Sequence, residues 1–294
     1  MSEMHAPSTG EILEQLSGLL GRTHVSEDYV SFRSELLKAQ AQVRDAATDS
    51  DEPRADQTPQ RGKLDPATVP MDTALLATLL RSIRAASGGQ HQQETNLDQL
   101  LQAARQEPPL LEQLARRTAC GPDKDYLEEL AGRVEIPVGV LVFVGRILAA
   151  PFVARHISAA DTQGDGTSGM TRSESGHCPA CGSPPGLALL RGEEGRRVLC
   201  CSLCGQRWAF ARLACPHCGN ENQRSLVTLT LEEHEARWIE ACETCKGYVK
   251  TLDERKLPVG QAVIPLVEEA ATLHLDLVAE EEGYRPKLPY AALT

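Results

Sequence analysis

The chain has 294 residues, of which 41% are hydrophobic and 4% aromatic, and its formal net charge is −11. A chain of this length and composition is expected to form about two globular domains. The acidic balance disfavours nucleic-acid phosphates and anionic membranes, which proteins usually contact through clustered Lys and Arg. We therefore expect no nucleic-acid ligand and no membrane insertion, and the composition favours a protein partner.

The N-terminal half is predicted to be an all-α bundle. Its apolar residues recur at helical spacing, interrupted by the polar segment 48–60, which we expect to be an exposed loop. Asn96 is a predicted N-cap for the helix that carries Leu97 and Leu101. The predicted helices include residues 9–20, 29–43, 75–83, 97–101, 110–115 and 126–134.

The most apolar stretch runs from Pro137 to Ala150 and is predicted to be a buried helix. It is shorter than the roughly 20 residues that span a bilayer. The N-terminus, MSEMHAPSTGEILEQL, has neither the basic nor the apolar region of an export signal. No export signal is therefore visible, and the thiols are expected to stay reduced.

A Gly-, Ser- and Thr-rich segment, 161–176, is predicted to be a flexible linker. Beyond it, alternating residues predict one β-hairpin over 187–199 and a second over 226–241. Each hairpin joins two cysteine pairs, so the pattern is a repeat. The predicted fold class is α+β. Its domains are a helical domain 1–160, the linker 161–176, a four-cysteine module 177–212, and a second four-cysteine module with a C-terminal helix, 213–294.

Four Cys-x-x-Cys pairs are the strongest chemical signal in the chain. A two-residue gap makes a tight turn whose backbone N–H groups can point at the sulfurs, and a glycine follows three of the pairs. Four such pairs in register indicate metal binding rather than disulfides. The predicted metal ligands are Cys178, Cys181, Cys201, Cys204, Cys215, Cys218, Cys242 and Cys245.

Sequential pairing places the first four cysteines on one ion and the last four on another, because each intervening segment can fold as one hairpin. A cross-braced arrangement stays open from spacing alone. A divalent ion held by four sulfurs has no open position for water or substrate, so such a site is structural or electron-carrying. Both Zn²⁺ and a mononuclear iron centre suit this ligand set.

The remaining cysteines, histidines and aromatic residues of the chain are interpreted as packing or surface residues. We expect Cys120 and Cys200 to be buried without ligating metal, and His177 and His217 to be outside the ligand sets. Trp208, Trp238 and Tyr248 are interpreted as core of the small modules, with contact to a partner as the alternative. The run Glu280 to Glu282 is interpreted as a solvated helix face.

These motifs together resemble the FdhE family of formate dehydrogenase accessory proteins. The segments that carry the resemblance are HCPACGSPP from His177, LCCSLC from Leu199, CPHCGN from Cys215, CETCKGYVK from Cys242 and DLVAEEEGY from Asp276. The resemblance implies a cytoplasmic protein that is not itself an enzyme. It implies rubredoxin-like modules holding two metal ions, with iron favoured and zinc as the alternative. The implied partner is the catalytic subunit of a respiratory formate dehydrogenase, which needs the protein to become active.

Two other classes remain open from the residues alone. Paired four-cysteine ribbons also occur in nucleic-acid-binding proteins, but those carry a basic stripe, whereas here the arginines near the cysteines are scattered. A thiol–disulfide or electron-transfer protein would need one pair free of metal. A weak homo-oligomer also remains open.

Overall fold

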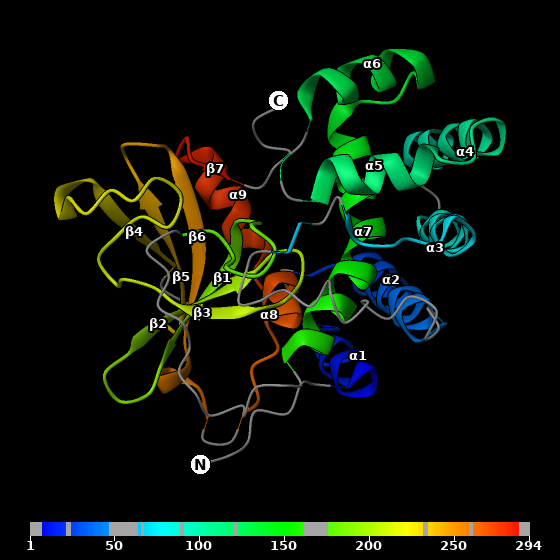
Figure 1. Cartoon of the computed structure of the whole chain (residues 1–294). Coiled ribbons are helices and arrows are strands. Elements are labelled where there is room, and N and C mark those ends of the chain that lie inside the picture. The colour runs from blue at the N-terminus through cyan, green and yellow to red at the C-terminus, as the bar shows by residue number, and fades with distance from the viewer. Residues whose placement is uncertain are drawn as a thin grey trace.

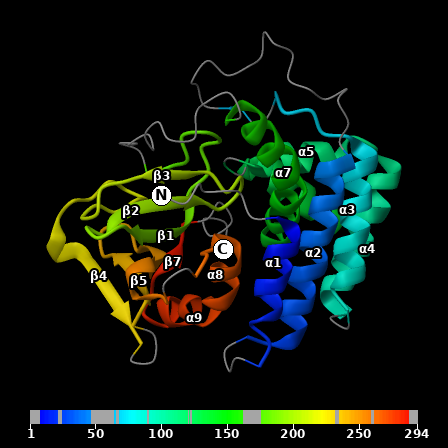
Figure 2. The same ribbon diagram turned by 90° about the horizontal axis from the view of Figure 1, so that it is seen from below.

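The computed structural model describes residues 8–21, 25–46, 64–65, 68–88, 91–119, 121, 123–161, 176–231, 235–258 and 261–287. A helical layer lies on one side of the molecule and a β-sheet on the other, and a short helix, α8, lies between them (Figure 1). The view from below shows the same two layers, with the sheet and its two C-terminal helices facing the N-terminal helices (Figure 2). The α+β class predicted from the sequence is confirmed.

The N-terminal helices begin at polar caps and bury one apolar face each. Ser8 and Glu11 form a capping box that satisfies backbone N–H groups at the start of the first helix, and Asp72 and Asp123 cap two later helices. The helices are α1 (Thr9–Ser17), α2 (Glu27–Ala46), α3 (Thr73–Ala86), α4 (His91–Gln106), α5 (Leu110–Ala119), α6 (Lys124–Val134) and α7 (Val138–Asp161).

Two expectations for this half are wrong. Asn96 does not cap α4, which begins at His91; Asn96 lies inside the helix, 3% exposed, and accepts a hydrogen bond from Gln92. The polar run HQQET that opens α4 shows no apolar periodicity, so the start of the helix left no signal in the sequence.

The apolar helix α7 does not end near Ala150. It continues through Pro151 to Asp161, and its segment Val138–Ile157 is long and apolar enough to cross a membrane by length and composition. The apolar segment is therefore longer than predicted, and the prediction that it is too short to span a bilayer is wrong. Because 56% of the apolar window is buried inside the fold, α7 has the character of a core helix, and this one segment is weak evidence for a membrane span.

The sheet joins both cysteine modules in the order β3-β2-β1-β6-β5-β4, and β7 pairs with β6. The two predicted hairpins correspond to β1–β2 and β4–β5. Parallel pairing of β1 with β6, with Leu187 opposite Lys250, connects the modules. The strands are β1 (Pro185–Arg191), β2 (Arg196–Cys201), β3 (Arg207–Ala209), β4 (Leu226–Thr230), β5 (Arg237–Cys242), β6 (Gly247–Asp253) and β7 (Arg285–Pro286).

Two C-terminal helices, α8 (Pro265–Ala271) and α9 (Leu273–Glu281), attach to this sheet through partly buried ion pairs. Arg237 of β5 donates two hydrogen bonds to Glu268 of α8, at 2.8 and 3.0 Å. Asp276 of α9 accepts from Lys250 and from the Tyr248 hydroxyl, each at 2.8 Å. These bonds fix α8 and α9 against β5 and β6.

One contiguous apolar core extends from the helices into the first cysteine module. Leu79 and Leu114 of the helical layer belong to the same buried cluster as Trp208, Cys178 and Cys181. The domain boundaries expected from the sequence remain predictions, and the described helices and first module share this core. Most of the expected linker, residues 162–175, and the expected loop 48–60 lie outside the described residues.

Candidate metal centres

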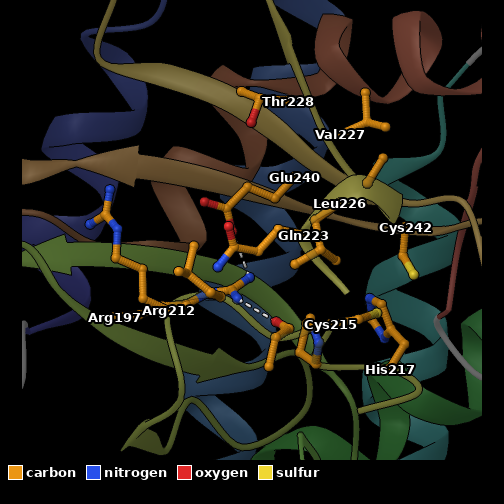
Figure 3. Close-up of a pocket in the computed structure, with 14 residues that line it drawn as sticks. Arg197, Arg212, Cys215, His217, Gln223, Leu226, Val227, Thr228, Glu240 and Cys242 are labelled. Carbon is orange, nitrogen blue, oxygen red and sulfur yellow. Dashed lines mark hydrogen bonds and ion pairs between the residues drawn. The ribbon is translucent and has the colours of Figure 1, made fainter. Parts of the chain in front are cut away.

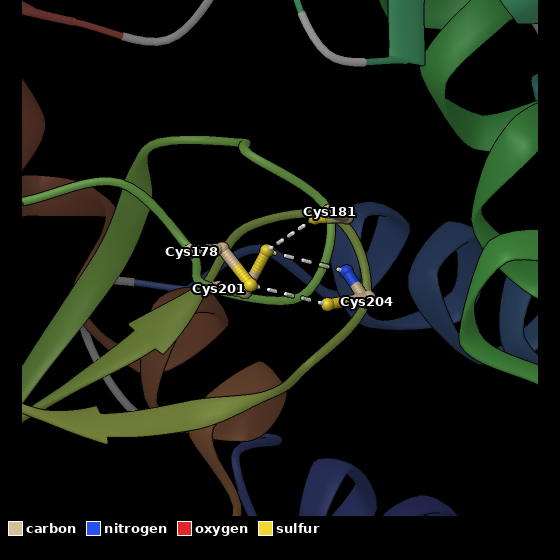
Figure 4. A group of neighbouring side chains, drawn as sticks. All are labelled: Cys178, Cys181, Cys201 and Cys204. Atoms are coloured by element: carbon tan, nitrogen blue, oxygen red, sulfur yellow. Dashed lines mark hydrogen bonds between the residues drawn. The ribbon is translucent and has the colours of Figure 1, made fainter. Parts of the chain in front are cut away.

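Cys178, Cys181, Cys201 and Cys204 converge on one point, and their four sulfur atoms all lie within 4.8 Å of one another (Figure 4). The Sγ atoms of Cys178 and Cys204 are 3.7 Å apart, and those of Cys181 and Cys201 are 3.4 Å apart. A tetrahedron with metal–sulfur bonds of about 2.3 Å has edges of about 3.8 Å. The first cluster therefore has the dimensions of a tetrathiolate metal site.

Two knuckles position these sulfurs. Gly182 and Gly205, each following a cysteine pair, have φ of 78° and 76°, a left-handed conformation that favours glycine. In the second knuckle the backbone N–H groups of Leu203 and Cys204 point at the Cys201 sulfur, at 3.4 and 3.5 Å. Such donors stabilise a thiolate. The turn geometry expected from the two-residue spacing is therefore present in the first module.

The second cluster repeats this geometry. The sulfur of Cys215 is 3.7 Å from that of Cys245, and the sulfur of Cys218 is 3.8 Å from that of Cys242. The fourth pair has no glycine after it, and Lys246 instead adopts the left-handed conformation with φ of 55°. The clusters are thus formed from sequential cysteine pairs, and the cross-braced alternative does not occur.

Neighbouring thiols, burial and backbone donors shift the pKa values of the cluster cysteines in different directions. Hydrogen bonds from Cys178 and Cys181 raise the pKa of Cys204, and burial raises the pKa of Cys215. At Cys242, burial acts to raise the pKa, but backbone N–H donors of Cys245 and Thr244 outweigh it and lower the pKa to about 7. Several negative charges at this spacing require a cation at the centre, which a divalent metal ion supplies.

The two clusters differ in exposure. Cys178 and Cys181 are 2% and 0% exposed and belong to the core shared with the helices, whereas Cys218 of the second cluster lies at the surface. Arg146 of α7 reinforces the first cluster, because its guanidinium donates to the Ser202 hydroxyl within the second knuckle at 3.0 Å. The first cluster is therefore fixed from the helical side, and the second is not.

A small cavity of about 160 Å³ lies beside the second cluster, and Arg197 of β2 forms part of its wall (Figure 3). Arg197 is 3% exposed, and its guanidinium forms an ion pair with Glu240 of β5 at 2.7 Å. It also donates to the backbone carbonyl of Ala214, directly before Cys215, at 2.9 Å. One buried cation thus links the two modules and supports the loop that carries the second cluster.

His177, His217 and Cys200 are not members of either four-cysteine group in the described part of the chain. His217 has its Nε2 atom 2.9 Å from the Tyr248 carbonyl, and burial lowers its pKa to about 4. Cys200 is 1% exposed in a separate apolar cluster, where burial raises its pKa to about 12. His177 is exposed, and Cys120 lies outside the described residues.

Of the aromatic residues singled out from the sequence, Trp208 is 0% exposed and Tyr248 is 5% exposed, so both are core residues. Trp238 is partly exposed, with the Lys256 ammonium over its ring. Sequence reasoning missed Arg146 and Arg197. In the sequence Arg146 is a single basic residue in an apolar segment and Arg197 is the second of two adjacent arginines, and only the packing of a distant segment shows why each is buried.

Comparisons with known proteins agree with this geometry. Residues 177–212 match the family model described as "FdhE, central domain", and residues 213–292 match "FdhE, C-terminal domain". The "Protein FdhE homolog" of Aquifex aeolicus is 35% identical over 111 residues, which cover 37% of this chain and 38% of that protein. The one of Pseudomonas aeruginosa strain PAO1 is 36% identical over 121 residues and also has 38% of its length covered.

The chain thus spans 38% of the length of each of these two relatives. The fold is also similar to the crystal structure of the FdhE protein from Pseudomonas aeruginosa, with a TM-score of 0.62 and 24% identity. That match covers 99% of this chain and 98% of the crystallised one, so the likeness in fold includes the helical half.

Proposed function

This chain belongs to the FdhE family through residues 177–292, and we propose that it is an accessory protein for a respiratory formate dehydrogenase. In this proposal the chain works in the cytoplasm and binds the catalytic subunit of that enzyme during maturation. It has no catalytic site of its own. The eight clustered cysteines hold two metal ions that stabilise the binding scaffold.

The closed form of both cysteine clusters is the observation that favours binding over catalysis. Each cluster offers four thiolates at tetrahedral spacing, and a divalent ion in such a set has no free position for a substrate. The ions would fasten loops that have little core of their own, because metal affinity and folding are coupled in such modules. The client would then contact the outer surface of the modules and the helices.

Iron is the metal favoured by the family resemblance, and zinc is the alternative. The four-sulfur set fits both ions, and the amide donors at Cys201 and Cys245 suit a thiolate on either. An iron ion in this set would also give the protein a one-electron couple. The role proposed here uses only the ion's ability to hold the loops together.

The proposal is tested by complementation in cells that lack the endogenous protein, with formate-dependent dye reduction as the readout. Cys178→Ala and Cys242→Ala should abolish the activity, because each removes one ligand of a cluster. Cys200→Ala is the matched control, since Cys200 is buried beside a ligand but belongs to neither cluster. Full enzyme activity in cells with no copy of the gene would refute the accessory role.

Anaerobic purification provides the second test. We expect about two metal ions per chain by elemental analysis and co-purification of the catalytic subunit. A red-brown oxidised protein would identify iron, and a colourless zinc protein from iron-replete cells would refute iron. One ion or fewer would contradict the two-centre assignment and favour the thiol-redox alternative. Tight DNA binding at physiological salt would favour the nucleic-acid alternative.

A further inference from the structure

A cleft of about 580 Å³ lies where the helical layer, the first cysteine module and the C-terminal helices meet. Residues of α2 and α7 form one wall, and residues of β6, α8 and α9 form the other. The loop Ser202–Gly205, which carries one ligand of the first cluster, lines it as well. The volume falls within the range of pockets that bind small molecules, roughly 300–1,000 Å³.

The charge of this cleft is opposite to that of the chain. Five basic and three acidic side chains line it, although the whole chain has a net charge of −11. Two of the cations are almost fully buried: Arg146 is 8% exposed and Lys250 is 7% exposed. Buried cations are costly unless an anion accompanies them. Lys250 has such a partner in Asp276, at 2.8 Å.

Arg33 of α2 carries an unpaired nitrogen atom at this cleft. It lines the cleft, and its buried Nε atom has no hydrogen-bond partner among the described residues. Arg146 is instead oriented by the Ala119 carbonyl, at 2.9 Å, and by Ser202. One guanidinium held by protein oxygens and one with an unpaired Nε atom therefore line the same cleft. A guanidinium binds carboxylates and phosphates well.

Glu269 of α8 is one of the acidic side chains that line the cleft. Its carboxyl group lies against Gly186, so closely that a Cβ atom at that glycine would be 2.2 Å from the carboxyl oxygen. Burial raises the pKa of Glu269, although Lys250 and Arg33 oppose the shift. A protonated Glu269 would leave the positive charge of the cleft in surplus and could donate a hydrogen bond to an oxyanion.

The cleft also has an apolar part. Phe143 of α7 and Leu273 of α9 line it, and they are 44% and 38% exposed, which is high for such large apolar side chains. Ile147 and Leu266 lie along the same lining. An apolar surface beside an anion-binding group suits a ligand that has both characters.

We propose that this cleft binds a small amphiphilic anion, a carboxylate or phosphate on an apolar body, with Arg33 as its anchor and Phe143 and Leu273 in contact with the body. This proposal does not depend on the accessory role, because it concerns a cavity outside both cysteine clusters. No part of it requires the client enzyme.

The test is isothermal titration calorimetry on the full-length, metal-loaded chain, with octanoate and octyl phosphate as probes and octylamine as the cationic control. Both anions should bind, and octylamine should bind at least tenfold more weakly. Arg33→Leu should weaken octanoate binding roughly tenfold to a hundredfold, as expected for loss of a charged hydrogen bond. Arg105→Leu is the matched control, since Arg105 is exposed on α4 away from this cleft.

Two further variants separate the anchor from the apolar wall. Arg33→Lys should still bind the anions more tightly than octylamine. Phe143→Ser should bind octanoate more weakly than the wild type does, but still more tightly than it binds octylamine. Equal affinity for octanoate and octylamine, equal loss in the Arg33→Leu and Arg105→Leu variants, or no binding of either anion at millimolar concentration would each overturn the proposal. A melting curve and metal analysis of each variant confirm that the fold is intact.

Discussion

Replacing Arg197 by methionine should destabilise the protein by about 3 kcal/mol. Arg197 is buried and its ion pair with Glu240 joins β2 of the first module to β5 of the second. Removing one partner of a buried pair costs roughly 3–5 kcal/mol. The lower end applies here because the Glu240 side chain is 24% exposed and stays partly hydrated.

At roughly 2–4 °C per kcal/mol for a chain of this size, the melting temperature should fall by about 6–12 °C. The second metal ion should also dissociate faster, because the Ala214 carbonyl loses its donor next to Cys215. Arg196→Met is the matched control, since the neighbouring Arg196 has a side chain that is 79% exposed and should change stability by less than about 0.5 kcal/mol.

The double variant Arg197→Met with Glu240→Met distinguishes a lost ion pair from lost packing. If the cost comes from an unpaired carboxylate, removal of that carboxylate should recover most of the stability. Thermal melts of the metal-loaded wild type, the two single variants and the double variant measure these differences. A fall of less than 2 °C for Arg197→Met, or no recovery in the double variant, would refute the reasoning.

Four further outcomes are expected. A chelator should remove the second ion before the first, since Cys218 is exposed, and simultaneous loss in a metal-release assay would contradict this. Gly145→Ala should destabilise by about 1–2 kcal/mol in urea melts, because its Cβ would lie 2.9 Å from an α5 carbonyl oxygen, whereas Gly132→Ala on open α6 should stabilise slightly. Burial raises the pKa of Glu269 above 4.5, so the folded state favours the protonated carboxyl group and the protein loses stability as the pH rises above 4.5. Glu269→Gln should therefore melt at a higher temperature than the wild type at pH 8 but not at pH 4. Protease cleavage within 162–175 should leave two fragments that co-elute in gel filtration, because the helices and the first module share one core, and separate elution would refute that coupling.

The local features of this fold could be predicted from the sequence. Each metal cluster is formed by two short knuckles and the hairpin between them, so every ligand of a cluster lies within about thirty residues of the others. The periodicity of the helices is equally local, and the expected helices 75–83 and 126–134 lie within α3 and α6. Local geometry therefore predicted which cysteines meet.

The long-range packing could not be predicted in the same way. Nothing near Arg146 shows that Ser202 accepts its hydrogen bond, 56 residues along the chain. The start of α4 was mispredicted for a different reason: its polar first turn gives no periodic signal, even though the helix is regular. Tertiary contacts therefore limit the prediction of buried polar groups, and the lack of an apolar pattern limits the prediction of helix starts.

Strand β6 shows how the two modules become one unit. Every residue of its sequence, GYVKTLD, is buried, although Lys250, Thr251 and Asp253 are polar. Its charged residues are tolerated because Lys250 pairs with Asp276 and Asp253 pairs with Arg255. Since β6 hydrogen-bonds to β1 on one side and β5 on the other, loss of either metal centre should disturb the strand that holds the other module. The repeat in the sequence indicates two modules, and the central polar strand makes their stability interdependent.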